Sequence, residues 1–152
     1  MPEHVPLVDR VPERVRERPT WLISRAYARA SGLLQEGFAQ GGGGLRSYHY
    51  RLLAGLDEWG PASQAALGRG TGIDRSDVTA ALVDLEQRGL VRRDVNQADR
   101  RRNVVTITAA GAMHLEALDS VVDEIQERLL APLSEGERRQ FITLTRRIAA
   151  GD

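Results

Sequence analysis

The chain has 152 residues, with 21 basic and 21 acidic side chains and a formal net charge of zero. It contains no cysteine, which excludes a disulfide framework, a thiolate zinc site and a cysteine redox switch. No apolar run approaches the roughly 18 residues of a membrane span, and the charged start lacks the apolar core of a signal peptide. We therefore expect a soluble cytoplasmic protein, built as one domain or as one lobe with extra helices.

The first segment is expected to be an arm followed by a long helix. Residues 1–18 hold three prolines and mixed charge, which predicts an arm with at most a short helix over 13–18. Pro19 suits the first turn of a helix predicted over 21–38. Four glycines at 41–44 should end that helix, because glycine loses much backbone entropy on helix formation.

Two more helices are predicted before residue 72. The helix over 45–58 carries one apolar face, and Gly60-Pro61 ends it because a residue before proline disfavours the helical region. Ser63 can cap a short helix over 64–70 that Gly70 and Gly72 close. The residues of the apolar face of the first of these helices are Leu45, His49, Leu52, Leu53 and Leu56.

The next helix has two different faces. Asp74 is its expected N-cap, and Asp77 adds negative charge to its first turn. One face is a buried stripe at i, i+3, i+4 and i+7, and the opposite face is small or hydrogen-bonding. Such a face can approach base edges closely. The stripe is Val78, Ala81, Leu82 and Leu85, and the opposite face is Arg75, Ser76, Thr79, Ala80 and Val83.

A hairpin with an arginine-rich tip follows. Gly89 is a good helix C-terminal cap, and strands are predicted over 90–93 and 103–107, joined by a loop that holds three consecutive arginines, 100–102. A helix pair followed by such a hairpin is the order of a winged helix-turn-helix. We therefore predict a mainly α fold with a small β-hairpin wing, and a DNA-binding protein.

The C-terminal third is helical again. Thr108 restarts a helix, Pro132 breaks it, and Ser134 with Glu137 forms a capping box for a final helix. A seam in the first of these helices has heptad-like spacing, and the final helix bears further apolar residues. This surface exceeds what a small lobe can cover and predicts a dimer. The seam is Leu115, Leu118, Val122, Ile125 and Leu129, and the final helix carries Phe141, Leu144 and Ile148.

From about Trp21 to Ala149 the chain resembles the MarR family of bacterial transcription regulators. The order and spacing of four stretches carry the likeness: Ser63–Gly68, Asp74–Val91, Asp99–Arg101 and Val105–Gly111. The resemblance implies a homodimer with intertwined terminal helices and two winged lobes that read a palindrome. On this basis we expect an N-terminal arm (1–18), a helical dimerisation region (19–44 and 112–152) and a DNA-binding lobe (45–111).

The resemblance also implies the roles of individual residues. The recognition helix would place Arg75, Ser76 and Thr79 in the major groove, and a helix start would place Ser63 and Gln64 at the DNA backbone. The family's Asp-x-Arg wing motif falls on Asp99 and Arg101, with Arg101 in the minor groove and Arg100 or Arg102 at phosphates. The competing interpretation is a solvated, charged hairpin tip and ordinary helix-surface residues.

A ligand crevice between the dimerisation helices and the lobe is a further implication of the resemblance. Trp21, Arg25 and His49 are the candidates for holding a small aromatic or phenolic anion, because an indole, a guanidinium and an imidazole suit such a guest. The alternative is that the histidine is a bonded core residue and the tryptophan serves packing.

The sequence therefore predicts a homodimeric, ligand-responsive repressor that binds a palindromic DNA operator. The alternative is a winged-helix protein-interaction module, which the zero net charge keeps open. An enzyme is not expected, because the three histidines are scattered and neither a catalytic triad nor a phosphate loop is recognisable. Neither a cofactor nor a metal is expected.

Overall fold

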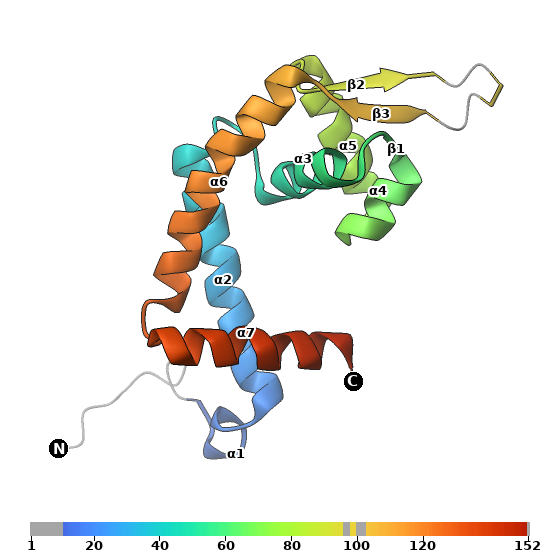
Figure 1. Cartoon of the computed structure of the whole chain (residues 1–152). Coiled ribbons are helices and arrows are strands. Elements are labelled where there is room, and N and C mark those ends of the chain that lie inside the picture. The colour runs from blue at the N-terminus through green and yellow to red at the C-terminus, as the bar shows by residue number, and fades with distance from the viewer. Residues whose placement is uncertain (1–10, 96–97, 100–102, 152) are drawn as a thin grey trace.

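A computed structural model describes residues 11–95, 98–99 and 103–151 of the chain. It is mainly helical with one small antiparallel sheet, as the sequence predicts (Figure 1). The elements in chain order are α1 (Glu13–Arg16), α2 (Pro19–Gly41), α3 (Ser47–Trp59), β1 (Ala62–Ser63), α4 (Gln64–Thr71), α5 (Arg75–Gln87), β2 (Val91–Asp94), β3 (Val104–Ile107), α6 (Ala109–Leu130) and α7 (Glu135–Ala150).

The elements form a stem and a lobe. Helices α2 and α6 run side by side as the stem, and α3, α4, α5 and the sheet form the lobe at one end (Figure 1). Strands β2 and β3 point away from the lobe, and α7 lies at a steep angle to the stem at the opposite end. None of the helices in the described part of the chain is both long enough and apolar enough to cross a membrane.

Side-chain caps start three of the helices, of which those at Ser63 and Ser134 were predicted. The Ser63 hydroxyl accepts a hydrogen bond from the Ala66 amide at 3.2 Å, and the Thr108 hydroxyl accepts one from the Gly111 amide at 3.0 Å. Ser134 and Glu137 form the reciprocal capping box, at 3.3 and 2.7 Å. Asp74 occupies the N-cap position of α5, but its carboxylate makes no capping hydrogen bond, so the prediction was right about the position alone.

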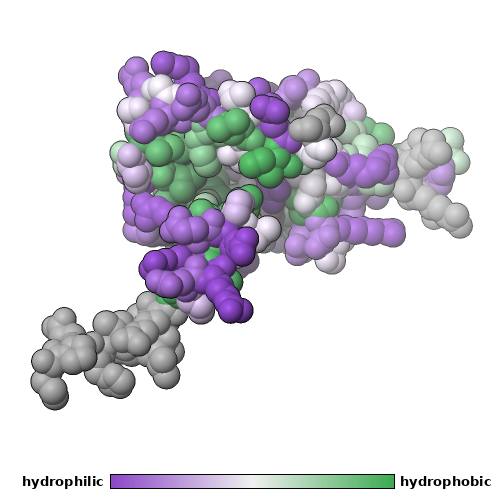
Figure 2. Space-filling view, turned by 90° about the horizontal axis from the view of Figure 1, so that it is seen from below, coloured by the Kyte–Doolittle hydropathy of each residue, from purple (hydrophilic) through white to green (hydrophobic). Residues whose placement is uncertain are grey.

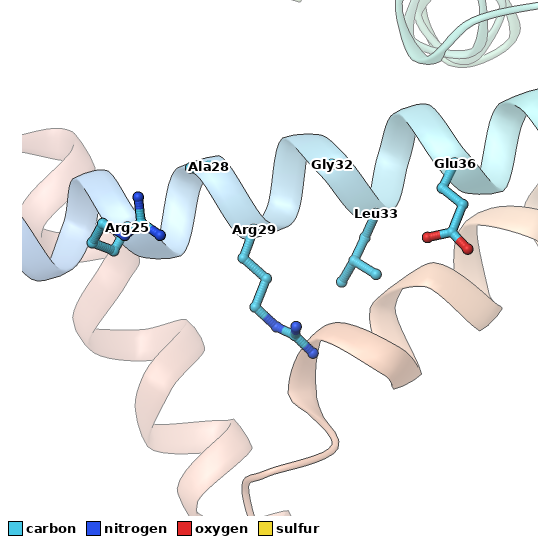
Figure 3. A pocket seen from close by; sticks show the side chains of 6 residues that line it. All are labelled: Arg25, Ala28, Arg29, Gly32, Leu33 and Glu36. Carbon is cyan, nitrogen blue, oxygen red and sulfur yellow. The ribbon is translucent and has the colours of Figure 1, made fainter. Parts of the chain in front are cut away.

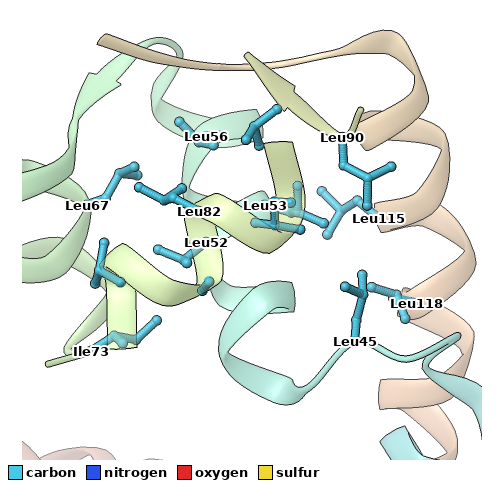
Figure 4. Close-up of a cluster of buried hydrophobic side chains, with 14 of the residues drawn as sticks. Leu45, Leu52, Leu53, Leu56, Leu67, Ile73, Leu82, Leu90, Leu115 and Leu118 are labelled. Atoms are coloured by element: carbon cyan, nitrogen blue, oxygen red, sulfur yellow. The ribbon is translucent and has the colours of Figure 1, made fainter. Parts of the chain in front are cut away.

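The lobe is closed around a leucine core, shown in Figure 4. The predicted stripe of α5, including Val78 and Leu82, is at most 1% exposed. Leu115 and Leu118 of α6 enter the same cluster, which joins lobe and stem. Burial of a leucine side chain contributes roughly 1.5–3 kcal/mol, so this cluster fixes the orientation of α5 relative to the stem.

The third strand, β1, was not predicted. It pairs antiparallel with β3 through Ala62↔Val105 and Ser63↔Val104, in a sheet of order β1-β3-β2. A two-residue strand has no periodicity that a sequence can reveal, because its pairing is set by the tertiary fold. The pairing fixes the start of α4 against the root of the β2–β3 hairpin.

The seam of α6 packs within the chain. Ile125 is 2% exposed and lies against Gly37 of α2, where a Cβ atom would fall within 2.5 Å of the isoleucine side chain. Glycine therefore permits the close approach of the two stem helices. Much of the apolar surface that stays uncovered lies on α2 and α7, where seven large hydrophobic residues are 40–74% exposed: Leu22, Ile23, Tyr27, Phe141, Ile142, Leu144 and Ile148.

Candidate nucleic-acid interface

Helix α5 presents a polar face at its N-terminal half. Arg75, Ser76 and Thr79 are all exposed, while the residues on the other side of the helix are buried in the leucine core. The predicted division of α5 into two faces is thus present. Because the buried side is rigidly packed, the exposed side chains project from a fixed helix.

Helix α4 begins directly beside this face. The Gln64 Nε2 donates a hydrogen bond to the Thr79 hydroxyl oxygen at 2.5 Å, and the Thr79 hydroxyl donates to the carbonyl oxygen of Arg75 at 2.9 Å. Ser63 uses an oxygen lone pair for the α4 cap and keeps its hydroxyl proton for another acceptor. The structure therefore brings four of the predicted DNA-contact residues together.

A hollow of about 960 Å³ lies between α4, α5 and the start of β3. Arg69 and Arg75 contribute positive charge to its lining, and Asp74 contributes one negative charge. The side-chain oxygen of Asn103 is buried there without a hydrogen-bond partner. The hollow gives the N-terminal ends of both helices a concave, mostly basic surface.

The wing arginines can be followed only in part. Arg100, Arg101 and Arg102 lie outside the described residues, while Asp99 lies in the described part of the loop between β2 and β3. At the root of the hairpin, Arg92 pairs with Asp94 at 3.2 Å and Arg93 pairs with Glu86 at 2.6 Å. These two arginines are thus engaged with acidic side chains of the same lobe.

The three ligand candidates are split between two places. The Arg25 guanidinium carbon lies 5.9 Å from the centre of the Trp21 ring, near the start of α2. His49 lies beside the other end of α2, where Tyr50 approaches Phe38 with ring centroids 6.3 Å apart. Since the helix rises 1.5 Å per residue, Trp21 and Phe38 are separated by roughly 25 Å, so the structure does not bring His49 to the other two.

Arg25 lines an open groove along α2, of about 630 Å³ (Figure 3). Arg29 and Glu36 lie farther along the groove. The Arg29 guanidinium donates to the Arg128 carbonyl of α6 at 3.5 Å, and Arg128 pairs with Glu36 at 3.2 Å. Two guanidinium groups therefore line the groove, and that of Arg25 lies beside the indole of Trp21.

His49 is a bonded core residue in this structure. It is 3% exposed, and its Nδ1 accepts from the Arg46 backbone N–H at 2.9 Å. Because Nδ1 is an acceptor, the proton of the neutral ring is on Nε2, which lies 3.0 Å from the Asp84 carboxylate. Burial lowers the pKa of His49, and although Asp84 opposes that shift the pKa remains below its usual value.

Asp84 continues this chain of contacts to the stem. It pairs with Arg88 at 3.0 Å and its pKa is lowered, chiefly by the hydrogen bond from Arg88. The Arg88 guanidinium also donates to the backbone carbonyls of Gly43 and Gly44, at 2.9 and 3.4 Å. Sequence reasoning missed this network, although the i, i+4 spacing of Asp84 and Arg88 was the available signal.

Within the described residues, no group of three or more His, Cys, Asp or Glu side chains could hold a metal ion. The residues that the lobe gathers at its surface are instead hydrogen-bonding groups and arginines beside two helix starts. This arrangement suits a large anionic partner that is read by direct contact.

Comparison with known proteins agrees with this geometry. A sequence model of the MarR family matches residues 44–102, which take in α3, α4, α5 and β2 of the lobe. The HTH-type transcriptional repressor NicR of Pseudomonas putida is 30% identical over 151 residues, covering 99% of this chain and 94% of that protein. The chain belongs to the MarR family.

Two further relatives extend the comparison. The transcriptional regulator HosA of Escherichia coli O157:H7 is 31% identical over 104 residues, covering 68% of this MarR-family chain and 77% of HosA. The structure of BpsR from Bordetella bronchiseptica has a TM-score of 0.80 and 25% identity, covering 93% of this chain and 100% of BpsR. The DNA binding of BpsR is regulated by 6-hydroxynicotinic acid. NicR and HosA are transcription regulators, and this chain is a transcription regulator of the same family.

Proposed function

We propose that the protein is a homodimeric repressor that binds a palindromic DNA operator and is released by a small anionic or aromatic effector. The observation that carries the proposal is the exposed polar face of α5 beside the start of α4, on a lobe whose core holds both helices in place. In the proposed complex, α5 of each protomer enters the major groove and half-sites lie about one helical turn apart.

The DNA contacts are divided among the elements of the lobe. Arg75, Ser76 and Thr79 project from α5 toward base edges, and Ser63 donates its hydroxyl proton to a phosphate at the start of α4. The wing contacts are proposed from the sequence: Arg101 in the minor groove, Asp99 orienting it, and Arg100 or Arg102 at phosphates.

A second copy of the chain is proposed to cover the apolar surface of α2 and α7. Figure 2, seen from the end that carries α1 and α7, shows hydrophobic residues gathered in a patch with hydrophilic ones around it. All residues of α7 apart from Arg138 are exposed, so the helix has little to pack against in its own chain. Pairing of residues 19–44 and 112–152 with the same segments of a partner would bury this surface.

The effector is proposed to bind near the start of α2. Trp21 can stack on an aromatic ring, and Arg25, which lies 5.9 Å from that indole and lines the groove of Figure 3, can pair with a carboxylate. His49 has both ring nitrogens bonded, so an effector would have to displace Asp84 to reach Nε2. The relative BpsR responds to an aromatic acid of this chemical class. Binding would shift the spacing of the lobes so that both half-sites cannot be engaged.

The DNA proposal is tested by titrating the full-length protein against DNA from upstream of its own gene, with random DNA as competitor. Binding should be specific and should weaken steeply with salt, because arginines that neutralise phosphates release counterions. Arg75→Ala and Arg101→Ala should each weaken binding about tenfold or more, while Arg14→Ala on α1 is the matched control. Equal binding of wild type and both variants would refute the assignment of α5 and the wing.

The effector proposal needs a separate measurement. 6-Hydroxynicotinic acid and benzoate are titrated into the protein–DNA complex, and the release of DNA is followed. Trp21→Ala and Arg25→Ala should blunt release more than they alter DNA affinity, and His49→Ala tests the third candidate. Release that is unchanged in all three variants would remove these residues from the effector site.

A further inference from the structure

We propose that Gln64 is a base-reading residue and that Thr79 is the residue that positions it. In this arrangement the Gln64 amide recognises an adenine in the major groove, and Thr79 presents its methyl group rather than its hydroxyl proton to the DNA. The inference deepens the proposed function, since it specifies one position of the operator, and it rests on that function.

The hydroxyl of Thr79 has no proton left for DNA. A threonine hydroxyl has one proton, and here it is donated to the carbonyl oxygen of Arg75, one turn earlier in α5, at 2.9 Å. The same oxygen accepts from Gln64 Nε2 at 2.5 Å. A base that contacts exposed Thr79 therefore meets its methyl group, which suits an apolar edge such as the methyl of thymine.

The amide of Gln64 keeps the groups that adenine requires. An amide nitrogen carries two protons, and only one of them is used on Thr79. The second proton and the amide oxygen remain, and glutamine uses such a pair to donate to N7 and accept from the N6 amino group of adenine. Guanine is disfavoured because both N7 and O6 are acceptors, and O6 would oppose the amide oxygen.

The contact between α4 and α5 also removes conformational freedom before DNA arrives. Glutamine has several rotatable bonds and loses considerable rotamer entropy when it is ordered. Thr79 orders it in the free protein, and Thr79 is itself fixed through its bond to the backbone of α5. The rotamer entropy of Gln64 is thus lost when the protein folds and not when it binds DNA, which favours a selective contact.

A phosphate contact is the competing role for Gln64, and it makes a different prediction. A neutral amide on a phosphate would strengthen binding to every sequence alike, because the phosphate backbone carries no direct sequence information. An amide on adenine would strengthen binding to one sequence at one position. The sequence dependence of the variants therefore separates the two roles.

The experiment selects operators from a randomised duplex pool with the full-length wild-type protein and with Gln64→Ala, Thr79→Val and the matched control Gln87→Ala. Wild type and Gln87→Ala should require an A·T pair at one position of each half-site. Gln64→Ala should lose that requirement there alone, with a fall in discrimination of roughly five- to hundredfold. Thr79→Val keeps a methyl group but lacks the acceptor, so it should relax the same position.

A base analogue supplies the decisive arm. Replacing that adenine by 7-deazaadenine removes the N7 acceptor, so wild type should lose affinity while Gln64→Ala should not respond. Circular dichroism verifies that each variant is folded. A uniform loss of affinity in Gln64→Ala with an unchanged base preference, or relaxation of different positions by the two variants, would overturn the proposal. If wild type selects no sequence at all, the proposed DNA-binding function itself fails.

Discussion

The stability of the lobe should fall between pH 7.5 and pH 5.5 because of His49. The folded protein holds this ring neutral, since Nδ1 accepts the Arg46 amide proton and cannot also carry a proton without losing that bond. Burial is the largest cause of its lowered pKa, and Arg88 and Arg46 add to it, while Asp84 opposes it. The unfolded chain has no such constraint and should protonate His49 near pH 6.5.

The sign and the size of the effect follow from linkage. As the pH falls below about 6.5 the unfolded state takes up a proton that the folded state does not, so the free energy of unfolding decreases until the folded pKa is reached. One such proton lowers the free energy of unfolding by at most about 1.4 kcal/mol between pH 7.5 and 5.5. The pKa of Asp84 is lowered in the folded state, so this carboxylate contributes to stability above its unfolded pKa of about 3.9. That contribution to the free energy of unfolding is lost only in more acidic solution, below the pH range of this experiment.

The measurement is urea unfolding at pH 7.5, 6.5 and 5.5, at one protein concentration because the proposed dimer would make stability depend on concentration. His49→Gln is the informative variant: its side-chain oxygen can still accept the Arg46 amide proton, and it does not titrate in this range. The variant should lose the His49 part of the pH dependence, whereas the control His114→Gln should retain it. Equal pH dependence in wild type and His49→Gln would refute the reasoning.

Three further changes test the fold and the assembly. Leu82→Ala, at a side chain with no exposed surface, should lower the free energy of unfolding by about 2–5 kcal/mol in denaturant titration. Gly111→Ala would press a Cβ atom onto the carbonyl of Leu90, so the melting temperature should fall and the sheet–α6 junction should exchange amide hydrogens faster. Ile148→Glu, at a residue 65% exposed on α7, should shift sedimentation toward the monomer, and an unchanged dimer would exclude this residue from the interface.

Local patterns predicted most of the helices because their causes are local. The buried stripe of α5 follows from helical spacing, and the caps at Ser63, Thr108 and Ser134 depend on residues within one turn. Some boundaries differ from the prediction: α2 continues to Gly41, and α3 begins at Ser47 instead of Leu45. At α3 the His49 ring accepts the Arg46 N–H, a cap by histidine that helix propensity does not reveal.

The sequence could predict which residues of the candidate site are exposed, but not the hydrogen bonds that join them across helices. The exposed face of α5 follows from the position of the opposite, buried stripe. The sequence alone therefore places three residues on that exposed face: Arg75, Ser76 and Thr79. The partner of Thr79 could not, because Gln64 lies 15 residues earlier and the geometry of the turn between the helices brings them together. The same holds for His49 and Asp84, which come from different helices.

The contacts at the two ends of α5 bear on how an effector could release DNA. At its N-terminal half α5 is bonded to α4 through Thr79, and at its C-terminal end Arg88 donates to the carbonyls of Gly43 and Gly44 in the turn that follows α2. Both glycines have positive φ, at 60° and 88°, so this turn has a backbone shape that few other residues could adopt. In the proposed mechanism a shift of α2 would therefore reach α5 directly through Arg88. Because the helix is packed along one whole face, it would move as a unit with its DNA contacts, and the spacing between two lobes would change without any change inside them.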